Sequence, residues 1–151
     1  LYRRSLYTFW RRIVGPTMFF DVAKRQTCEV RRARTNTPLH ALITLNDIAY
    51  VEAARAMAQR VLKEGGADDD TRVNYAFRLA TVREPKPPEQ ALLKKRAEQL
   101  RANYKKDTEG AKALLTVGEF KRDETLDATD HAVYTVLCNL ILNLDEVITR
   151  E

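Results

Sequence analysis

The sequence predicts an all-α fold, a single compact bundle of about five to six helices with an irregular N-terminal segment. Apolar residues recur at helical spacing over most of the chain after residue 38, and these segments open on residues that commonly cap helices. Only five Gly and five Pro occur among 151 residues, of which 44% are apolar. This length and composition suit one core, so we expect residues 1–151 to form one helical domain.

The chain opens on Leu1 without an initiator Met or a leader, and it ends directly after a strong helical segment. We therefore expect a fragment or a single domain of a longer protein. The longest apolar runs fall far short of the roughly 20 residues that cross a bilayer, which predicts no membrane span.

Residues 5–14 fit either a strand or a short helix. Their large apolar side chains would share one helical face, which favours the helix. These side chains are Leu6, Phe9, Trp10 and Ile13. The apolar residues 18–20 that follow are expected to be irregular, with Phe19 or Phe20 anchored in the core.

The first long helical segment covers residues 38–64, with Thr37 as N-cap and Pro38 at the first helical position. Asn46 and Asp47 interrupt it, so that either Asp47 caps a second helix or one helix continues through them. Gly65 and Gly66 then close the segment. The expected apolar stripe consists of Leu39, Leu42, Ile43, Tyr50, Ala53, Met57 and Val61, and several alanines would let another helix pack closely.

Three further helices are expected before the end of the chain. One covers about residues 71–82 with Val73, Ala76, Phe77 and Ala80 on one face. After a Pro-rich linker, a charged surface helix at residues 89–106 presents one apolar edge of Ala91, Leu92, Ala97, Leu100 and Tyr104. A short helix capped by Asp107 or Thr108 runs to Val117, and residues 119–129 are expected to form a loop.

The last helix is predicted to be central to the core, because its apolar stripe is the longest in the chain. It is entered through Asp127, Thr129 and Asp130. The stripe consists of Ala132, Val133, Val136, Leu137, Leu140, Ile141, Leu144, Val147 and Ile148.

Positive charge is concentrated in the N-terminal part of the chain. Residues 1–64 hold 12 Lys and Arg against 5 Asp and Glu, and the remainder holds 14 against 16, which adds to the net charge of +5. Arginines among aromatic residues could bind nucleic acid, or they could pair with carboxylates of the second half or of neighbouring domains. The modest net charge and the lack of a nucleic-acid motif favour pairing.

Sequence motifs for common catalytic sites do not occur. The chain contains no GxxxxGK[ST], GxGxxG, HExxH or GxSxG sequence. Cys28 and Cys138 form no CxxC pattern, and a buried inert thiol is expected at Cys138. His40 and His131 lie 91 residues apart without a local ligand partner, which favours surface or capping histidines over metal or haem ligands. We therefore assign no catalytic and no metal-binding residue.

One polar group of residues is a candidate for binding a ligand or partner. It consists of Arg31, Arg32, Arg34, Asn36, Asn46, Asp47 and Glu52. Guanidinium groups beside carboxylates can bind a carboxylate, phosphate or sugar hydroxyls. The alternative, a structural network that joins the loop before Pro38 to the helix after it, is favoured because no nucleophile or acid and base pair accompanies the group.

Several sequence runs of the chain resemble the C-terminal domain of unknown function (fifteen-fifty-three) of planctomycete proteins that contain cytochrome-c domains. These runs are RSLYTFWRR at residues 4–12, RRARTNTPLHAL at 31–42, LND at 45–47, VEAAR at 51–55 and LILNLDE at 140–146. His40 departs from the Gln expected in this family, and no assigned catalytic residues can be carried over.

The resemblance implies the context of a large, exported multidomain protein, of which this chain would be the C-terminal fragment, located in the periplasm or at the cell surface. For the chain itself we favour a non-catalytic structural or interaction module. Its expected partners are the upstream domains of the parent chain and a protein or polysaccharide. The CxxCH haem-attachment motif is absent, so no cofactor is expected in this fragment. The alternative is part of an extracellular active site acting on polysaccharide or another polymer, with Arg34, Asp47 and Glu52 in a shared cleft.

Overall fold

A computed structural model describes residues 38–148 of the chain, and within that part it contains seven α-helices and no strand. The helices are α1 (Pro38–Asn46), α2 (Ile48–Glu64), α3 (Asp69–Thr81), α4 (Pro87–Lys106), α5 (Thr108–Leu115), α6 (Ala128–Leu142) and α7 (Asp145–Ile148). This confirms the all-α prediction. By its contacts the chain divides at residue 36, and the fold described here belongs to the unit of residues 37–151. The expectations for residues 1–37, including the short helix at 5–14, lie outside the described residues.

Aspartate side chains determine where four of the helices begin. Asp47, Asp68, Asp107 and Asp127 are the N-caps of α2, α3, α5 and α6. Each carboxylate accepts a hydrogen bond from a backbone N–H two or three residues further on, at 2.8–3.1 Å. Such a bond satisfies one of the N–H groups that a helix start leaves unpaired. Asp47 therefore caps a second helix, which was one of the two alternatives, and no single helix continues through residues 46 and 47.

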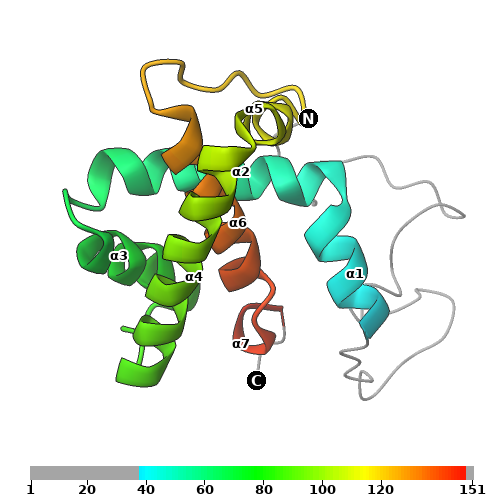
Figure 1. The fold of residues 1–151 in the computed structure, drawn as a ribbon. Helices are drawn as coiled ribbons and strands as arrows, with labels where there is room; N and C mark the ends of the chain where they lie inside the picture. The colour runs from blue at the N-terminus through cyan, green and yellow to red at the C-terminus, as the bar shows by residue number, and fades with distance from the viewer. Residues whose placement is uncertain (1–37, 149–151) are drawn as a thin grey trace, which may run out of the picture. The chain divides into compact units, whose positions relative to one another are not determined.

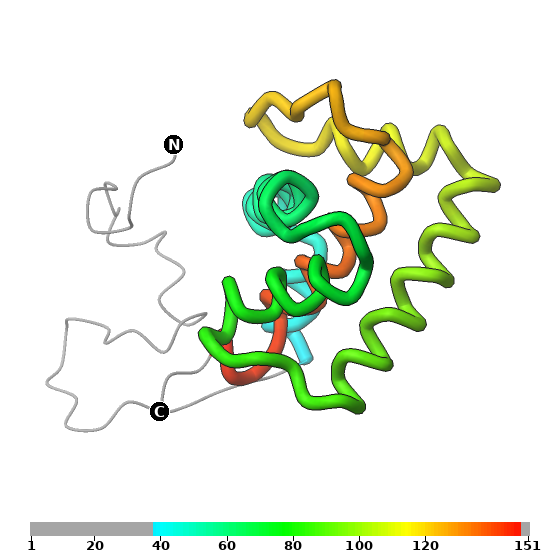
Figure 2. The backbone as a smooth tube through the Cα atoms, turned by 90° about the vertical axis from the view of Figure 1, so that its left-hand side faces the viewer, coloured from blue at the N-terminus to red at the C-terminus, as the bar shows by residue number. Residues whose placement is uncertain are grey.

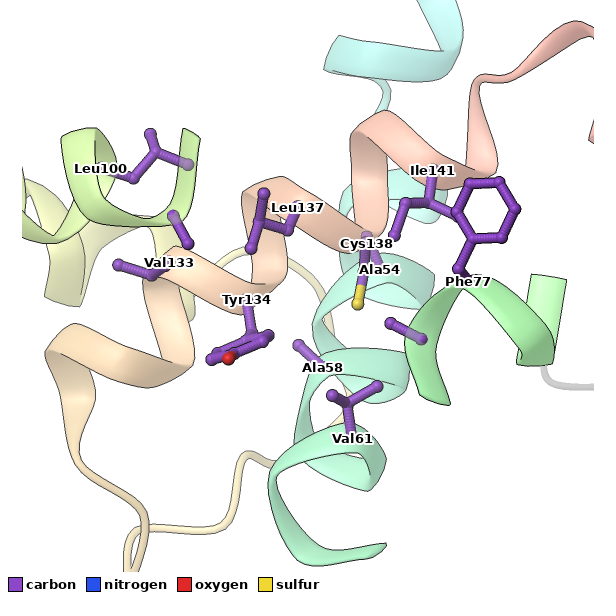
Figure 3. Close-up of a cluster of buried hydrophobic side chains, with 12 residues drawn as sticks. Ala54, Ala58, Val61, Phe77, Leu100, Val133, Tyr134, Leu137, Cys138 and Ile141 are labelled. Carbon is purple, nitrogen blue, oxygen red and sulfur yellow. The ribbon is translucent and has the colours of Figure 1, made fainter. Parts of the chain in front are cut away.

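Helix α6 forms the centre of the described bundle, as predicted, and contacts the six other helices (Figure 1). Its residues 131–135 are all buried, because neighbours surround this turn on every side. Figure 3 shows Tyr134, Cys138 and Ile141 of α6 beside small residues of α2 and Phe77 of α3. The helix ends at Leu142, earlier than the apolar pattern indicated, and α7 follows as a separate turn.

The apolar stripe predicted for residues 38–64 is partly wrong. Leu39 and Leu42 are 68% and 59% exposed, and Ala53 is exposed as well. The core face of α2 consists of Val51, Ala54, Ala58 and Val61, of which Val61 belongs to the predicted stripe. One cause is the break at Asp47, because α1 and α2 are separate helices that turn different faces to α6. Within α1 the inward residues are His40 and Thr44, and the Thr44 hydroxyl donates to Asn143 Oδ1 at 2.5 Å.

The faces of α3 and α4 match the expected patterns with two exceptions, both in α4. Val73 and Phe77 are buried in α3, and Ala97 and Leu100 are buried in α4. The exceptions are Ala91, which is exposed, and Leu92, which is 69% exposed, whereas the residue after Leu92 turns toward the core. No helix between residues 38 and 148 is long and apolar enough to cross a membrane.

Candidate interaction groove

The structure describes three of the seven candidate polar residues. Asn46 Nδ2 donates to the carbonyl oxygen of Leu42 at 2.7 Å, and Asp47 is the N-cap of α2. The Asn46 side chain thus binds the backbone of α1, and the Asp47 side chain binds the backbone of α2. Arg31, Arg32, Arg34 and Asn36 lie outside the described residues, so the convergence of the group stays a prediction.

The third of these residues, Glu52, holds a loop with the help of Arg55. Its buried carboxylate accepts a hydrogen bond from the backbone N–H of Phe120, and Arg55 donates to the carbonyl oxygens of Leu115 and Phe120. The two charged groups lie 4.0 Å apart, and Arg55 is only 3% exposed. Figure 2 shows the loop of residues 116–127, in yellow and orange, beside α2. We conclude that this buried pair fixes the loop on α2.

Both histidines are buried, which corrects the expectation of surface or capping positions. His131 is fully buried and His40 is 8% exposed, because the helix faces that carry them turn toward other helices. The Nε2 atom of His131 lies 3.2 Å from the carbonyl oxygen of Arg55. Burial lowers the pKa of the His131 imidazole, although this hydrogen bond opposes the effect. A neutral imidazole is therefore the form that the fold favours.

A charged network joins α3, α4 and α6. Arg101 donates two hydrogen bonds to Asp69, at 2.9 and 3.0 Å, and one to Asp130 at 2.8 Å. The phenolic O–H of Tyr134 donates to Asp69 at 2.6 Å. The bonds from Arg101 hold the pKa of the Asp69 carboxyl below its usual range, against the effect of partial burial. Both carboxylates thus bind the same guanidinium, and the network joins three helices.

An apolar groove of about 350 Å³ lies where α3, α4 and α6 meet. Its lining consists of Phe77 from α3, Leu92 and Leu93 from α4, Leu140 and Ile141 from α6, and Leu144 after α6, with Glu89 and Arg96 at its edge. Leu92 is 69% exposed, so the groove is open to solvent along α4. Concave, mostly apolar sites of about 300 to 1,000 Å³ are typical of ligand binding, and this groove falls at the lower end of that range.

Arg83 fixes one edge of the groove. Its guanidinium carbon lies 4.7 Å from the centre of the Phe77 ring, at a distance where the positive charge is attracted to the face of the ring. It also donates two hydrogen bonds to Glu89, each at 2.9 Å, and two to Glu146 at 2.7 and 3.0 Å. These bonds from Arg83 lower the pKa of Glu89 to about 2, with help from the backbone N–H of Lys86. The carboxylates of this edge are therefore already paired.

Arg96 differs from Arg83 in having no carboxylate partner among the described residues. Its side chain is exposed, and its contact with the Oε1 atom of Gln99 is 3.5 Å long. A long hydrogen bond between exposed groups contributes little to stability. The groove thus combines an apolar floor with one uncompensated positive charge at its edge.

Sequence reasoning did not select these groove residues. The adjacent leucines Leu92 and Leu93 give a weak signal, because the helix carries a heavily charged remainder and only one narrow apolar edge. Two consecutive residues point about 100° apart, so one of the two leucines is expected at the border of so narrow an edge. The other walls of the groove depend on how α6 packs against α3 and α4. The spacing of residues within one helix does not specify that packing.

Comparisons with known proteins give one result. A family model described as PSD1, protein of unknown function (DUF1553), matches residues 1–97. The matched part includes Leu92, Leu93 and Arg96 of the groove, whereas the wall formed by α6 lies beyond it. No curated protein and no solved structure matches the chain significantly. Within residues 38–148, no three His, Cys, Asp or Glu side chains are grouped so that they could hold a metal ion.

Proposed function

The chain belongs to the DUF1553 family of proteins of unknown function, and from that premise we propose that it is a non-catalytic helical interaction module. Its described part would bind a segment of a partner in the groove between α3, α4 and α6. The observation that carries the proposal is a preformed apolar groove whose mouth exposes Leu92 at 69% of its surface. Covering such a surface releases water from apolar groups and is favourable, at roughly 25 cal/mol per Å².

The role of the polar candidates supports an interaction module over an active site. Asp47 caps a helix, and the carboxylate of Glu52 binds the backbone N–H of Phe120. Part of an extracellular active site on polysaccharide would need these two carboxylates in a shared cleft with Arg34. Since the carboxylates of Asp47 and Glu52 already bind backbone N–H groups, the interaction module is the better supported of the two functions.

The sequence resemblance extends this proposal to the parent protein. It would be a large exported protein of the type that carries cytochrome-c domains, located in the periplasm or at the cell surface. Its upstream domains are the proposed source of the segment that enters the groove, and this fragment would carry no cofactor of its own. Support for this context comes from the RTNTP, LND and LILNLDE runs of the sequence.

A photocrosslinking experiment in the full-length parent protein tests the proposal. A benzophenone amino acid at position 92 should crosslink to one defined segment of the parent chain or of a stable partner. The same amino acid at position 113 is the control, because Ala113 is an exposed helical residue of α5 outside the groove. If position 92 gives no more crosslink than position 113, the groove does not bind a partner and the proposal is wrong.

A further inference from the structure

Resting on the proposed function, we propose that the groove binds an amphipathic helix of a partner polypeptide. The helix would place apolar side chains on the groove floor and a carboxylate against Arg96. The proposal rests on three properties of the groove, namely its open form, its preformed wall and its unpaired charge.

The open form of the groove favours a helix over an acyl chain. Leu92 is 69% exposed, and Leu140 and Leu144 are each only partly buried. An acyl chain in this groove would leave one side of its methylene groups in water. A helix instead buries its apolar face and covers the mouth of the groove with its polar face, as amphipathic helices do in hydrophobic grooves through anchors spaced three and four residues apart.

The wall of the groove is held in place before any partner binds. Arg83, in the turn between α3 and α4, binds Glu89 of α4 and Glu146 of α7, and its guanidinium lies against the Phe77 ring. The floor is part of the main core cluster through Phe77 and Ile141, which are 1% and 2% exposed. A preformed site loses little conformational entropy on binding, so even a small groove can contribute useful affinity.

The charge at the edge of the groove indicates what the partner helix carries. Glu89 and Arg83 compensate each other, which leaves the exposed Arg96 as the uncompensated charge among the residues that line the groove. A carboxylate on the partner would form a charge-assisted hydrogen bond with its guanidinium. A lysine at the same place would be repelled, so Arg96 would select among apolar helices by charge.

The crosslinked product from position 92 tests this inference. Peptide mapping is expected to show a single segment with leucine-type side chains at helical spacing and an acidic residue within one turn of them. A segment without an acidic residue, or one with a basic residue there, would overturn the inference but leave the proposed interaction module standing. A lipid adduct, recognised by its mass, would also overturn it. Absence of any specific crosslink would instead contradict the proposed function itself.

A charge reversal provides the second arm. Arg96→Glu in the full-length protein should lower the yield of the crosslink from position 92 about fivefold, because like charges would then face each other. Changing the mapped acidic residue of the partner to Lys should restore the yield in the Arg96→Glu background. Lys95→Glu is the matched control, since Lys95 is exposed on the same helix and does not line the groove. Equal losses in Arg96→Glu and Lys95→Glu would show that Arg96 does not select the partner.

Discussion

The guanidinium of Arg101 donates two hydrogen bonds to the carboxylate of Asp69, at 2.9 and 3.0 Å, and thereby joins α4 to the first turn of α3. Its Nε atom donates a third bond, at 2.8 Å, to Asp130 in the first turn of α6. Carboxylates also interact favourably with the N-terminal turns of helices. One arginine thus holds the starts of two helices against the side of a third.

Replacing Arg101 by Ala should destabilise the fold by about 2 kcal/mol, because the change removes three charge-assisted hydrogen bonds that are partly shielded from water. The Tyr134 hydroxyl would remain as a donor to Asp69, which limits the loss. Urea denaturation monitored by circular dichroism measures the difference. Lys95→Ala is the control on the exposed face of α4, where a change of under about 0.5 kcal/mol is expected. Equal effects of the two variants would show that the network is worth no more than a surface charge.

The buried imidazole of His131 should make stability depend on pH near neutrality. Burial lowers its pKa in the folded state, so between the folded pKa and the unfolded value of about 6.5 the unfolded chain binds more protons. The contribution is therefore fully present above about pH 6.5 and is lost as the pH falls toward the folded pKa. Its slope is at most about 1.4 kcal/mol per pH unit. Arg55 and Arg122 disfavour the charged imidazole further, whereas Asp123 favours it.

Urea denaturation at several pH values between 5 and 8 tests this dependence. The free energy of unfolding of the parent chain should fall as the pH is lowered through this range. In His131→Gln the same curve should be flatter, because Gln carries no titratable group. His40→Gln is the matched control, since it removes the other histidine of the chain. If His131→Gln keeps the slope of the parent chain, His131 is not the group responsible.

Val82 occupies a backbone conformation that a β-branched residue rarely adopts. It is the C-cap of α3 with φ of 64°, and its side chain is 87% exposed. Val82→Gly should stabilise the fold by about 1 kcal/mol, because glycine adopts the left-handed conformation without steric cost and little packing is lost. A thermal melt measures the change, and Val82→Ala serves as a control that shortens the side chain but keeps the Cβ atom. A lower melting temperature for Val82→Gly would mean that the exposed valine makes a contact the fold needs.

Local signals in the sequence predicted the helices well, since the caps act over two or three residues. Helix α1 begins at Pro38 as expected, and Asp107 is the one of the two expected caps that the structure has. Asp127, one of three residues expected at the entry to the last helix, is its N-cap. Burial of Cys138 and the central position of α6 also followed from the apolar pattern. Two long periodic segments between residues 38 and 148 are each divided. The division at Asp47 was one of the two alternatives, whereas the one after Leu142 was not expected.

Features that depend on partners distant in the chain could not be predicted. Arg55 binds carbonyl oxygens 60 and 65 positions further along, and no pattern around residue 55 indicates them. The burial of His131 and the exposure of Leu39 depend in the same way on how helices pack. Of the predicted polar group, Asn46, Asp47 and Glu52 have local or structural partners, whereas the arginines and Asn36 stay predictions.

The two leucines Leu92 and Leu100 of α4 should respond differently to truncation, because one faces the open groove and the other the core. Leu100 is 7% exposed and Leu92 is 69% exposed. Leu100→Ala should cost about 2 to 4 kcal/mol through lost burial and the cavity that remains, whereas Leu92→Ala should cost under about 0.5 kcal/mol. Urea denaturation of the two variants side by side measures both values in one helix. A large loss for Leu92→Ala would show that this leucine serves the fold, and it would remove the main reason to regard the groove as a binding surface.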